Sequence, residues 1–88
     1  MEEIISGEGH LSSVGHPKTE YQVRYEFRFV TRTIARPGLP QVATDVSGEG
    51  SITELGGQQI PEGTYHLDTG SEILRVKNLG LVWAVLSS

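Results

Sequence analysis

The chain has 88 residues, a formal net charge of −4 and no cysteine. A chain of this length holds one domain, residues 1–88, with a small core and a modest margin of stability. The negative charge disfavours nucleic-acid polymers and anionic membranes as partners. Without cysteine there is no disulfide framework, thiolate zinc site or cysteine nucleophile, so a small ligand, a protein partner or self-association is the expected supplement to stability.

The two ends of the chain give no targeting or membrane signal. Residues 1–7 are acidic and lack the basic and apolar regions of a secretory signal. The longest apolar run, residues 81–86, is far shorter than the roughly 20 residues that a spanning helix needs. We therefore expect a soluble cytoplasmic protein.

Turn-forming residues divide the chain into six segments with strand character. Apolar and polar residues alternate from Tyr21 to Phe29, as they do on a strand with one buried face. No window shows the apolar spacing of a long helix. The expected strands are residues 3–14, 20–33, 42–55, 63–68, 72–78 and 81–87. The sequence therefore predicts an all-β fold.

A seven-residue motif occurs twice, at residues 5–11 and 46–52, with Ser-Gly-Glu-Gly inside each copy. On a strand, the two glycines of each copy lie on the inward face. Such glycines indicate close backbone approach or sharp bending, which the coiled strands of a small barrel require. We predict a small six-stranded antiparallel barrel or a strongly coiled sandwich with two loosely repeated halves. Its predicted core comprises Tyr21, Val23, Tyr25, Phe27, Phe29, Ile52, Leu67, Val76 and Trp83.

The last predicted strand is apolar on both faces and needs cover on both sides. Either loops pack over its outer face, or that face meets another subunit. The second alternative makes Leu81, Val82, Trp83 and Val85 candidate interface residues.

Residues 45–50, Asp-Val-Ser-Gly-Glu-Gly, match the Asp-x-Ser-x-x-Gly element of PilZ domains, small barrels that bind cyclic di-GMP. That family also carries an upstream Arg-x-x-x-Arg element, which Arg28 with Arg32, and Arg32 with Arg36, resemble. The resemblance implies ligand-binding roles for these arginines and for Asp45 and Ser47. Guanidinium groups suit phosphates and guanine edges. The alternative is a solvated strand face and a repeated structural element that need no ligand.

Residues 68–71, Asp-Thr-Gly-Ser, resemble the active-site motif of aspartic proteases. Asp, Thr and Gly between two strands are also typical of a hairpin turn. Only eighteen residues follow Gly70, too few for the downstream half of that family. We therefore expect a turn.

The histidines do not have the spacing of a metal site. No two of His10, His16 and His66 lie two or four residues apart, and two of them fall on outward strand positions. No nucleophile elbow is present for Ser-His-Asp catalysis. We expect no metal, no cofactor and no enzymatic activity. The predicted function is a binding or assembly module, with PilZ-like cyclic dinucleotide binding as the alternative.

Overall fold

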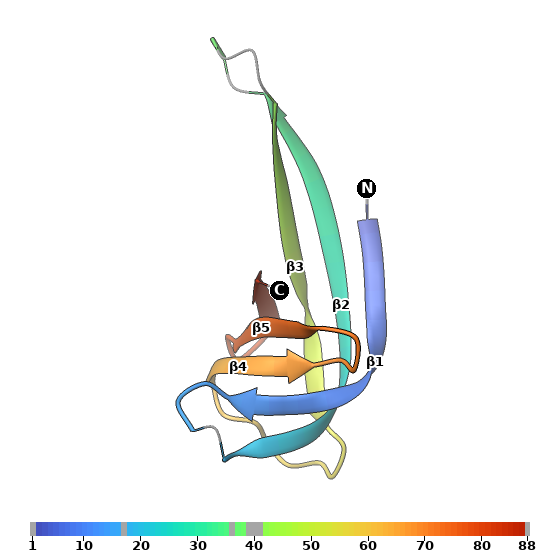
Figure 1. Cartoon of the computed structure of the whole chain (residues 1–88), viewed down its shortest axis with the longest axis vertical. Coiled ribbons are helices and arrows are strands. Elements are labelled where there is room, and N and C mark those ends of the chain that lie inside the picture. Colours follow the sequence, from blue (N-terminus) through green and yellow to red (C-terminus); the bar gives the residue numbers. More distant parts are fainter. Residues whose placement is uncertain (1, 17, 36, 39–41, 88) are drawn as a thin grey trace.

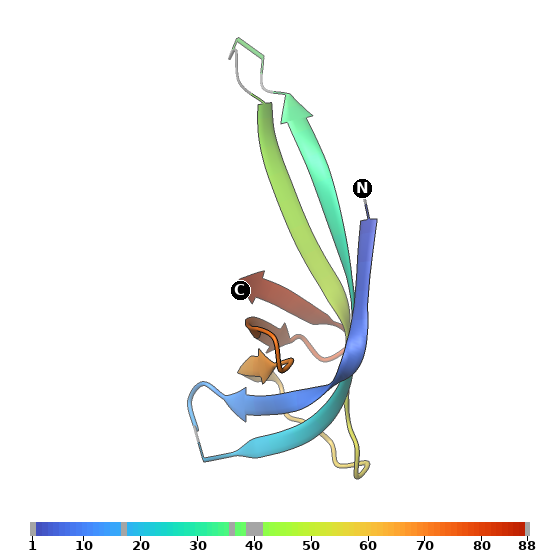
Figure 2. The same cartoon turned by 45° about the vertical axis from the view of Figure 1, so that its right-hand side comes forward.

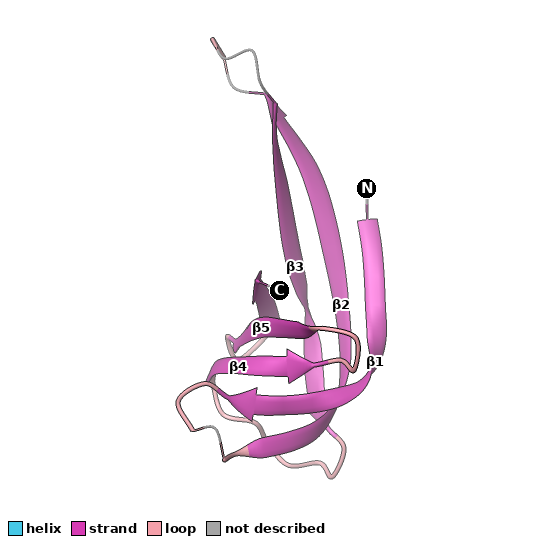
Figure 3. Ribbon diagram, viewed as in Figure 1, coloured by secondary structure: helices cyan, strands magenta, loops and turns pink. Residues whose placement is uncertain are grey.

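The computed structural model describes residues 2–16, 18–35, 37–38 and 42–87. Within these residues all regular structure is β-strand (Figure 3), and no helix is long and apolar enough to cross a membrane. The predicted strands are confirmed, with every end within two residues of the expected position. They are β1 (Glu2–Ser13), β2 (Glu20–Ala35), β3 (Val42–Glu54), β4 (Gly63–Asp68), β5 (Ile73–Asn78) and β6 (Trp83–Ser87).

The six strands close an antiparallel barrel in the order β1-β2-β3-β6-β5-β4. Consecutive strands are neighbours except at two places, where β3 pairs with β6 and β4 pairs with β1. The pairing of β4 with β1, in which Leu67 lies across from Leu11, completes the barrel. The predicted six-stranded barrel is therefore confirmed.

The strands β1, β2 and β3 extend beyond the barrel and form a second part of the molecule. β1 pairs with β4 only over residues 10–13, and β3 pairs with β6 only over residues 48–50. The rest of β1 and the first residues of β3 are held by β2 alone. We call this three-stranded projection, residues 2–9, 27–35 and 42–47, the arm. It rises from one end of the barrel (Figures 1 and 2) and gives the molecule extents of 51 × 25 × 24 Å.

The core fills the barrel and follows strand alternation. Val23, Tyr25 and Phe27 of β2 are buried, whereas Tyr21 and Phe29, at the two ends of the alternating stretch, are partly buried against the core. The predicted inward face of this strand is thus confirmed. The buried core consists of Leu11, Val23, Tyr25, Phe27, Ile52, Ile60, Tyr65, Leu67, Leu74, Val76 and Trp83.

Both copies of the repeated motif flank β2, one in β1 and one in β3. A Cβ atom on Gly9 would overlap the backbone oxygen of Asp68 on β4. A Cβ on Gly50 would overlap the backbone oxygen of Glu26 on β2. The expected close approach of neighbouring backbones is therefore found at the second glycine of each copy. It accompanies the sharp bend of β1 as that strand enters the barrel (Figure 1).

The connection between β3 and β4 covers the barrel end opposite the arm. Ile60 is buried there, and the side-chain amide of Asn78 donates hydrogen bonds to the backbone oxygens of Ile60 and Pro61 at 3.0 and 3.2 Å. The Tyr65 hydroxyl donates to the Pro61 oxygen at 2.7 Å. Two buried side chains thus hold the connection against the core.

Candidate binding surfaces

The outer face of the β2–β3 ribbon carries a polar groove with a volume of about 560 Å³. Strand alternation builds it, because residues two apart on each strand share a face and the register places the two sets side by side. Arg28 lies across from Glu49, and Val30 lies across from Ser47. We call this the outer groove. It is lined by Glu26, Arg28, Val30, Arg32, Ser47, Glu49, Gly50, Ser51 and Val82.

Carboxylates accompany the cations of the outer groove. The Arg28 Nε lies 3.3 Å from the Glu2 carboxylate of β1. The strand register places Arg32 across from Asp45. Both side chains of the Arg28–Glu2 pair are largely exposed, so the pair contributes little to stability. The groove therefore offers two guanidinium groups, of which the Arg28 group is already paired with a carboxylate.

Three of the five predicted ligand-binding residues line this one groove: Arg28, Arg32 and Ser47. Asp45 lies in β3, but its side chain is outside the described part of the structure. Arg36 lies outside the described residues altogether. A ligand-binding role for the five stays a prediction.

The four predicted interface residues divide between surface and core. Leu81 is fully exposed in the turn before β6, and Val82 is half-buried at the edge of the outer groove. Trp83 is 6 % exposed and packs against Tyr65 with a ring-centre distance of 5.5 Å. Val85 also packs against the core. Two of the four residues therefore fill the barrel, and an interface at this strand stays a prediction.

The inner face of the arm forms a smaller apolar groove that the sequence analysis did not identify. It lies where the arm leaves the barrel beside β5 and has a volume of about 260 Å³. Val46, on its β3 side, is 59 % exposed. We call this the inner groove. It is lined by Glu3, Ile5, Phe29, Thr31, Val46, Glu72 and Leu74. The signal available in the sequence was the continuation of inward-facing apolar positions past the end of the barrel.

The arm also has two open sheet edges. Residues 2–9 of β1 and 42–47 of β3 each pair with β2 on one side and with no described strand on the other. In Figure 2, β6 turns away from the β2–β3 ribbon, consistent with its short pairing with β3. An open edge presents unpaired backbone N–H and C=O groups to another strand.

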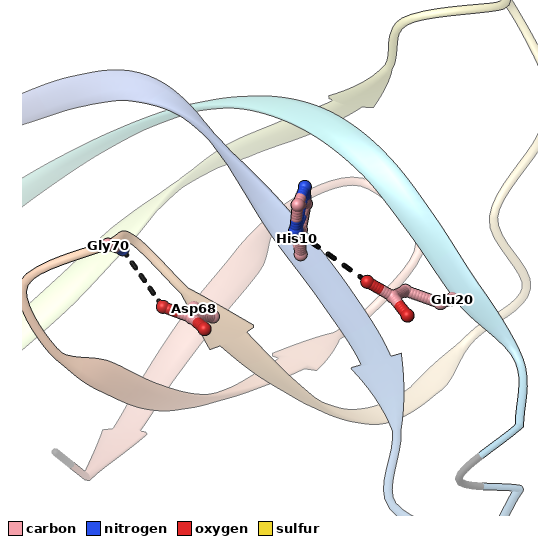
Figure 4. Close-up of polar contacts among 4 residues, drawn as sticks. All are labelled: His10, Glu20, Asp68 and Gly70. Carbon is pink, nitrogen blue, oxygen red and sulfur yellow. Dashed lines mark hydrogen bonds and ion pairs between the residues drawn. The ribbon is translucent and has the colours of Figure 1, made fainter.

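The histidine and carboxylate side chains near the β4–β5 turn form separate contacts (Figure 4). His10 Nδ1 lies 3.6 Å from the Glu20 carboxylate, and both side chains are exposed. Asp68, across from His10 in the register, accepts a hydrogen bond from the Gly70 N–H at 2.9 Å instead. Among the residues that the structure describes, no three His, Cys, Asp or Glu side chains are grouped to hold a metal.

The Asp-Thr-Gly-Ser segment is a hairpin turn, as expected. The Thr69 N–H donates to the Glu72 oxygen at 3.0 Å and closes the connection between β4 and β5. Gly70 has a φ of 91°, in the region that glycine favours. The Asp68 carboxylate is occupied in capping this turn.

Burial affects the chemistry of one tyrosine. Removal of the Tyr65 hydroxyl from water raises its pKa above the usual 10.0, and nearby Tyr21 adds to the effect. The hydroxyl is committed to the Pro61 oxygen. Tyr65 is therefore a structural donor that resists ionisation.

The structure defines a class: a small closed antiparallel β-barrel with an open-edged arm. No family model, curated protein or solved structure matches the chain. The resemblance of residues 45–50 to PilZ domains thus has no support from similarity over a longer part of the chain.

Proposed function

We propose that the protein is a non-enzymatic assembly module that self-associates through the open edge of β3. The carrying observation is that β6 leaves β3 beyond Gly48, so residues 42–47 pair with β2 and with no other described strand. The barrel closes into a ring, and the stretch of β3 within it that also pairs with β2 alone, residues 51–54, is shorter. Strand addition to an open edge is a common route to protein association.

Charge distinguishes the two edges of the arm. The open part of β1 carries Glu2, Glu3 and Glu8, so two such edges brought together would repel. The open part of β3, Val-Ala-Thr-Asp-Val-Ser, has a single charged residue and three β-branched ones. It also lacks the lysine or proline with which proteins protect exposed edges. The β3 edge is therefore the one suited to pairing with a second copy.

An antiparallel register centred on Thr44 suits this pairing. It places residue 42 across from residue 46 of the second copy and residue 45 across from residue 43. The one charged residue of each segment then avoids its counterpart. The contact is two-fold symmetric, as most homo-oligomer interfaces are. About six residues a side form a contact at the small end of protein interfaces, so the dimer is weak.

Sedimentation equilibrium of the natural chain and two variants tests this function. Ser47→Lys places a charge on the open edge, whereas Thr53→Lys places the same charge on the same face of β3 within the barrel. We expect concentration-dependent association that Ser47→Lys abolishes and Thr53→Lys retains. A monomer at all concentrations, or equal behaviour of the two variants, would overturn the proposal.

A second candidate function is cyclic dinucleotide binding in the outer groove. The observation in its favour is that Arg28, Arg32 and Ser47 line one groove of about 560 Å³, within the usual range of ligand pockets. The acidic neighbours of these arginines weigh against it, because a phosphate would have to displace the Glu2 carboxylate from Arg28. For this reason it ranks second.

Titration with cyclic di-GMP by calorimetry tests the second candidate. Arg32→Ala should weaken binding about tenfold or more, because a charge-assisted hydrogen bond is lost. Arg75→Ala removes an exposed arginine from β5, outside the groove, and should leave binding unchanged. Undetectable binding to the natural chain, or equal effects of the two variants, would eliminate the candidate.

A further inference from the structure

We propose that the inner groove binds an extended segment of a partner protein in which an apolar residue is flanked, two positions away, by lysine or arginine. This site is on the inner side of the arm and is independent of self-association through β3. Its elements are the apolar floor, the carboxylates at its rim and the open edge of β1 beside it.

The floor of the inner groove calls for an apolar side chain. Ile5 and Phe29 are partly buried against the core, Leu74 is buried, and Val46 is largely exposed. At about 260 Å³, the groove is smaller than the roughly 300–1,000 Å³ pockets that hold whole small molecules. It therefore suits a side chain of a peptide better than a cofactor.

The rim of the inner groove is acidic. Glu3 of β1 and Glu72 of the β4–β5 turn both line it, and neither forms an ion pair with any residue of the described structure. By contrast, Glu2 and Glu8 on the outer side of β1 each pair with an arginine of β2. The chain as a whole carries a charge of −4. Charge complementarity therefore favours a cationic partner over a second copy of this chain.

The open edge of β1 provides the backbone partner. Residues 2–9 pair with β2 along one edge and with no described strand along the other, so a segment added at this open edge gains main-chain hydrogen bonds. Inward-facing positions on a strand recur every two residues, as Glu3 and Ile5 do. A residue opposite Ile5 in the added strand then enters the apolar floor, and the residue two positions away lies opposite Glu3. The recognised pattern is thus a cation and an apolar residue with one residue between them.

A synthetic peptide, Thr-Lys-Thr-Leu-Thr-Lys-Thr, is the probe, and the same peptide with glutamate in place of lysine is its control. Binding is followed by NMR chemical shifts of the labelled natural chain and of the Ser47→Lys variant, so that self-association does not compete. We expect the lysine peptide to shift signals of the inner groove and β1, and the glutamate peptide to bind at least tenfold more weakly.

Two double variants with the same change in net charge distinguish binding at the inner groove from general attraction between the peptide and an acidic protein. Glu3→Lys with Glu72→Lys should weaken binding of the lysine peptide at least tenfold. Glu26→Lys with Glu62→Lys changes the net charge equally on exposed residues outside the inner groove and should keep most of the binding. Failure of the lysine peptide to bind, or equal losses in both pairs, would overturn the proposal. So would loss of self-association in the first pair, which would identify the occupant as a second copy.

Discussion

Glycine in the interior of these strands has a steric cause that differs from its role in turns. Gly50 occupies a position where any Cβ would overlap the backbone of β2, including the Phe27 Cα, which would lie 2.8 Å away. A backbone neighbour cannot rotate aside as a side chain does, so relief requires that the paired strands separate. Gly15, in contrast, has open space around its Cβ position.

Gly50→Ala is therefore expected to destabilise the barrel by about 3 kcal/mol or more, at the upper end of overpacking costs. Gly15→Ala should change the free energy of unfolding by no more than about 0.5 kcal/mol. Urea unfolding followed by Trp83 fluorescence measures both. Equal stabilities of the two variants would contradict the close approach of β2 and β3 at Gly50.

Burial of the Tyr65 hydroxyl makes the free energy of unfolding depend on pH in the alkaline range. Its pKa in the folded state is raised above 10.0 because burial disfavours the phenolate. The unfolded chain therefore releases this proton at lower pH than the folded chain. The stabilising contribution is fully present below about pH 10 and declines as the pH rises through the folded-state pKa.

Tyr65→Phe should cost about 1 kcal/mol at pH 8, the usual net value of one hydrogen bond, here the bond to Pro61. The difference from the natural chain should shrink toward pH 11, because phenylalanine has no proton to lose. Urea unfolding across this range checks the trend. A difference that stays constant up to pH 11 would show that Tyr65 does not ionise on unfolding.

At the scale of elements, two consecutive hairpins use the same turn chemistry. Asp68 and Asn78 end β4 and β5, and each side-chain oxygen accepts a hydrogen bond from the glycine N–H two residues later, at 2.9 Å. The two residues differ in burial, because Asp68 is exposed whereas Asn78 is 7 % exposed. Only the Asn78 amide also donates, to Ile60 and Pro61. One residue closes a turn, and the other also holds the end of the barrel.

Exchange of the two side-chain types tests this difference. Asp68→Asn keeps the acceptor of an exposed turn and should change stability by no more than about 0.5 kcal/mol. Asn78→Asp places a carboxylate against two backbone oxygens and should cost about 3 kcal/mol, because the buried charge faces two acceptors and keeps only the Gly80 N–H as a donor. Thermal unfolding by circular dichroism compares them, and similar melting temperatures would refute the proposed role of Asn78.

At the scale of the whole molecule, the described core and the open edge of β3 lie in different parts. Among the residues whose burial the structure describes, every buried core residue lies outside the far part of the arm, residues 33–44. The barrel closes through β4, β5 and β6, none of which pairs with those residues. The pairings that close the barrel therefore do not involve the far part of the arm.

Replacement of residues 33–44 by Asn-Gly joins Arg32 to Asp45, which already lie across from each other, through a two-residue hairpin turn. The shortened chain should keep its barrel, with a change in unfolding free energy of about 1 kcal/mol or less, because no residue of the described core is removed. It should also lose self-association. Urea unfolding measures the stability, and sedimentation measures the self-association. A shortened chain that fails to fold would show that residues 33–44 contribute to the stability of the barrel.

The sequence alone determined the six strands, the inward face of β2 and an all-β fold that is either a small barrel or a coiled sandwich. Alternation from Tyr21 to Phe29 is a local property, and so is the turn chemistry that ends each strand, and both are readable without the fold. The glycines of the repeat indicated close backbone approach because glycine alone removes the steric conflict. Leu11, Ile60, Tyr65 and Leu74 were not in the predicted core, although all four are buried.

Only the tertiary structure decided which strand lengths stay outside the barrel. Strand pairing sets this property, because the sequence pattern of the five-residue strand β6 does not show which part of β3 it pairs with, and β6 in fact pairs only with residues 48–50. Arg28, Arg32 and Ser47 line one groove, and the Glu2 carboxylate beside Arg28 comes from the pairing of β2 with β1. The inner groove likewise joins β1, β2 and β3 to β5, and such long-range contacts depend on how the barrel closes.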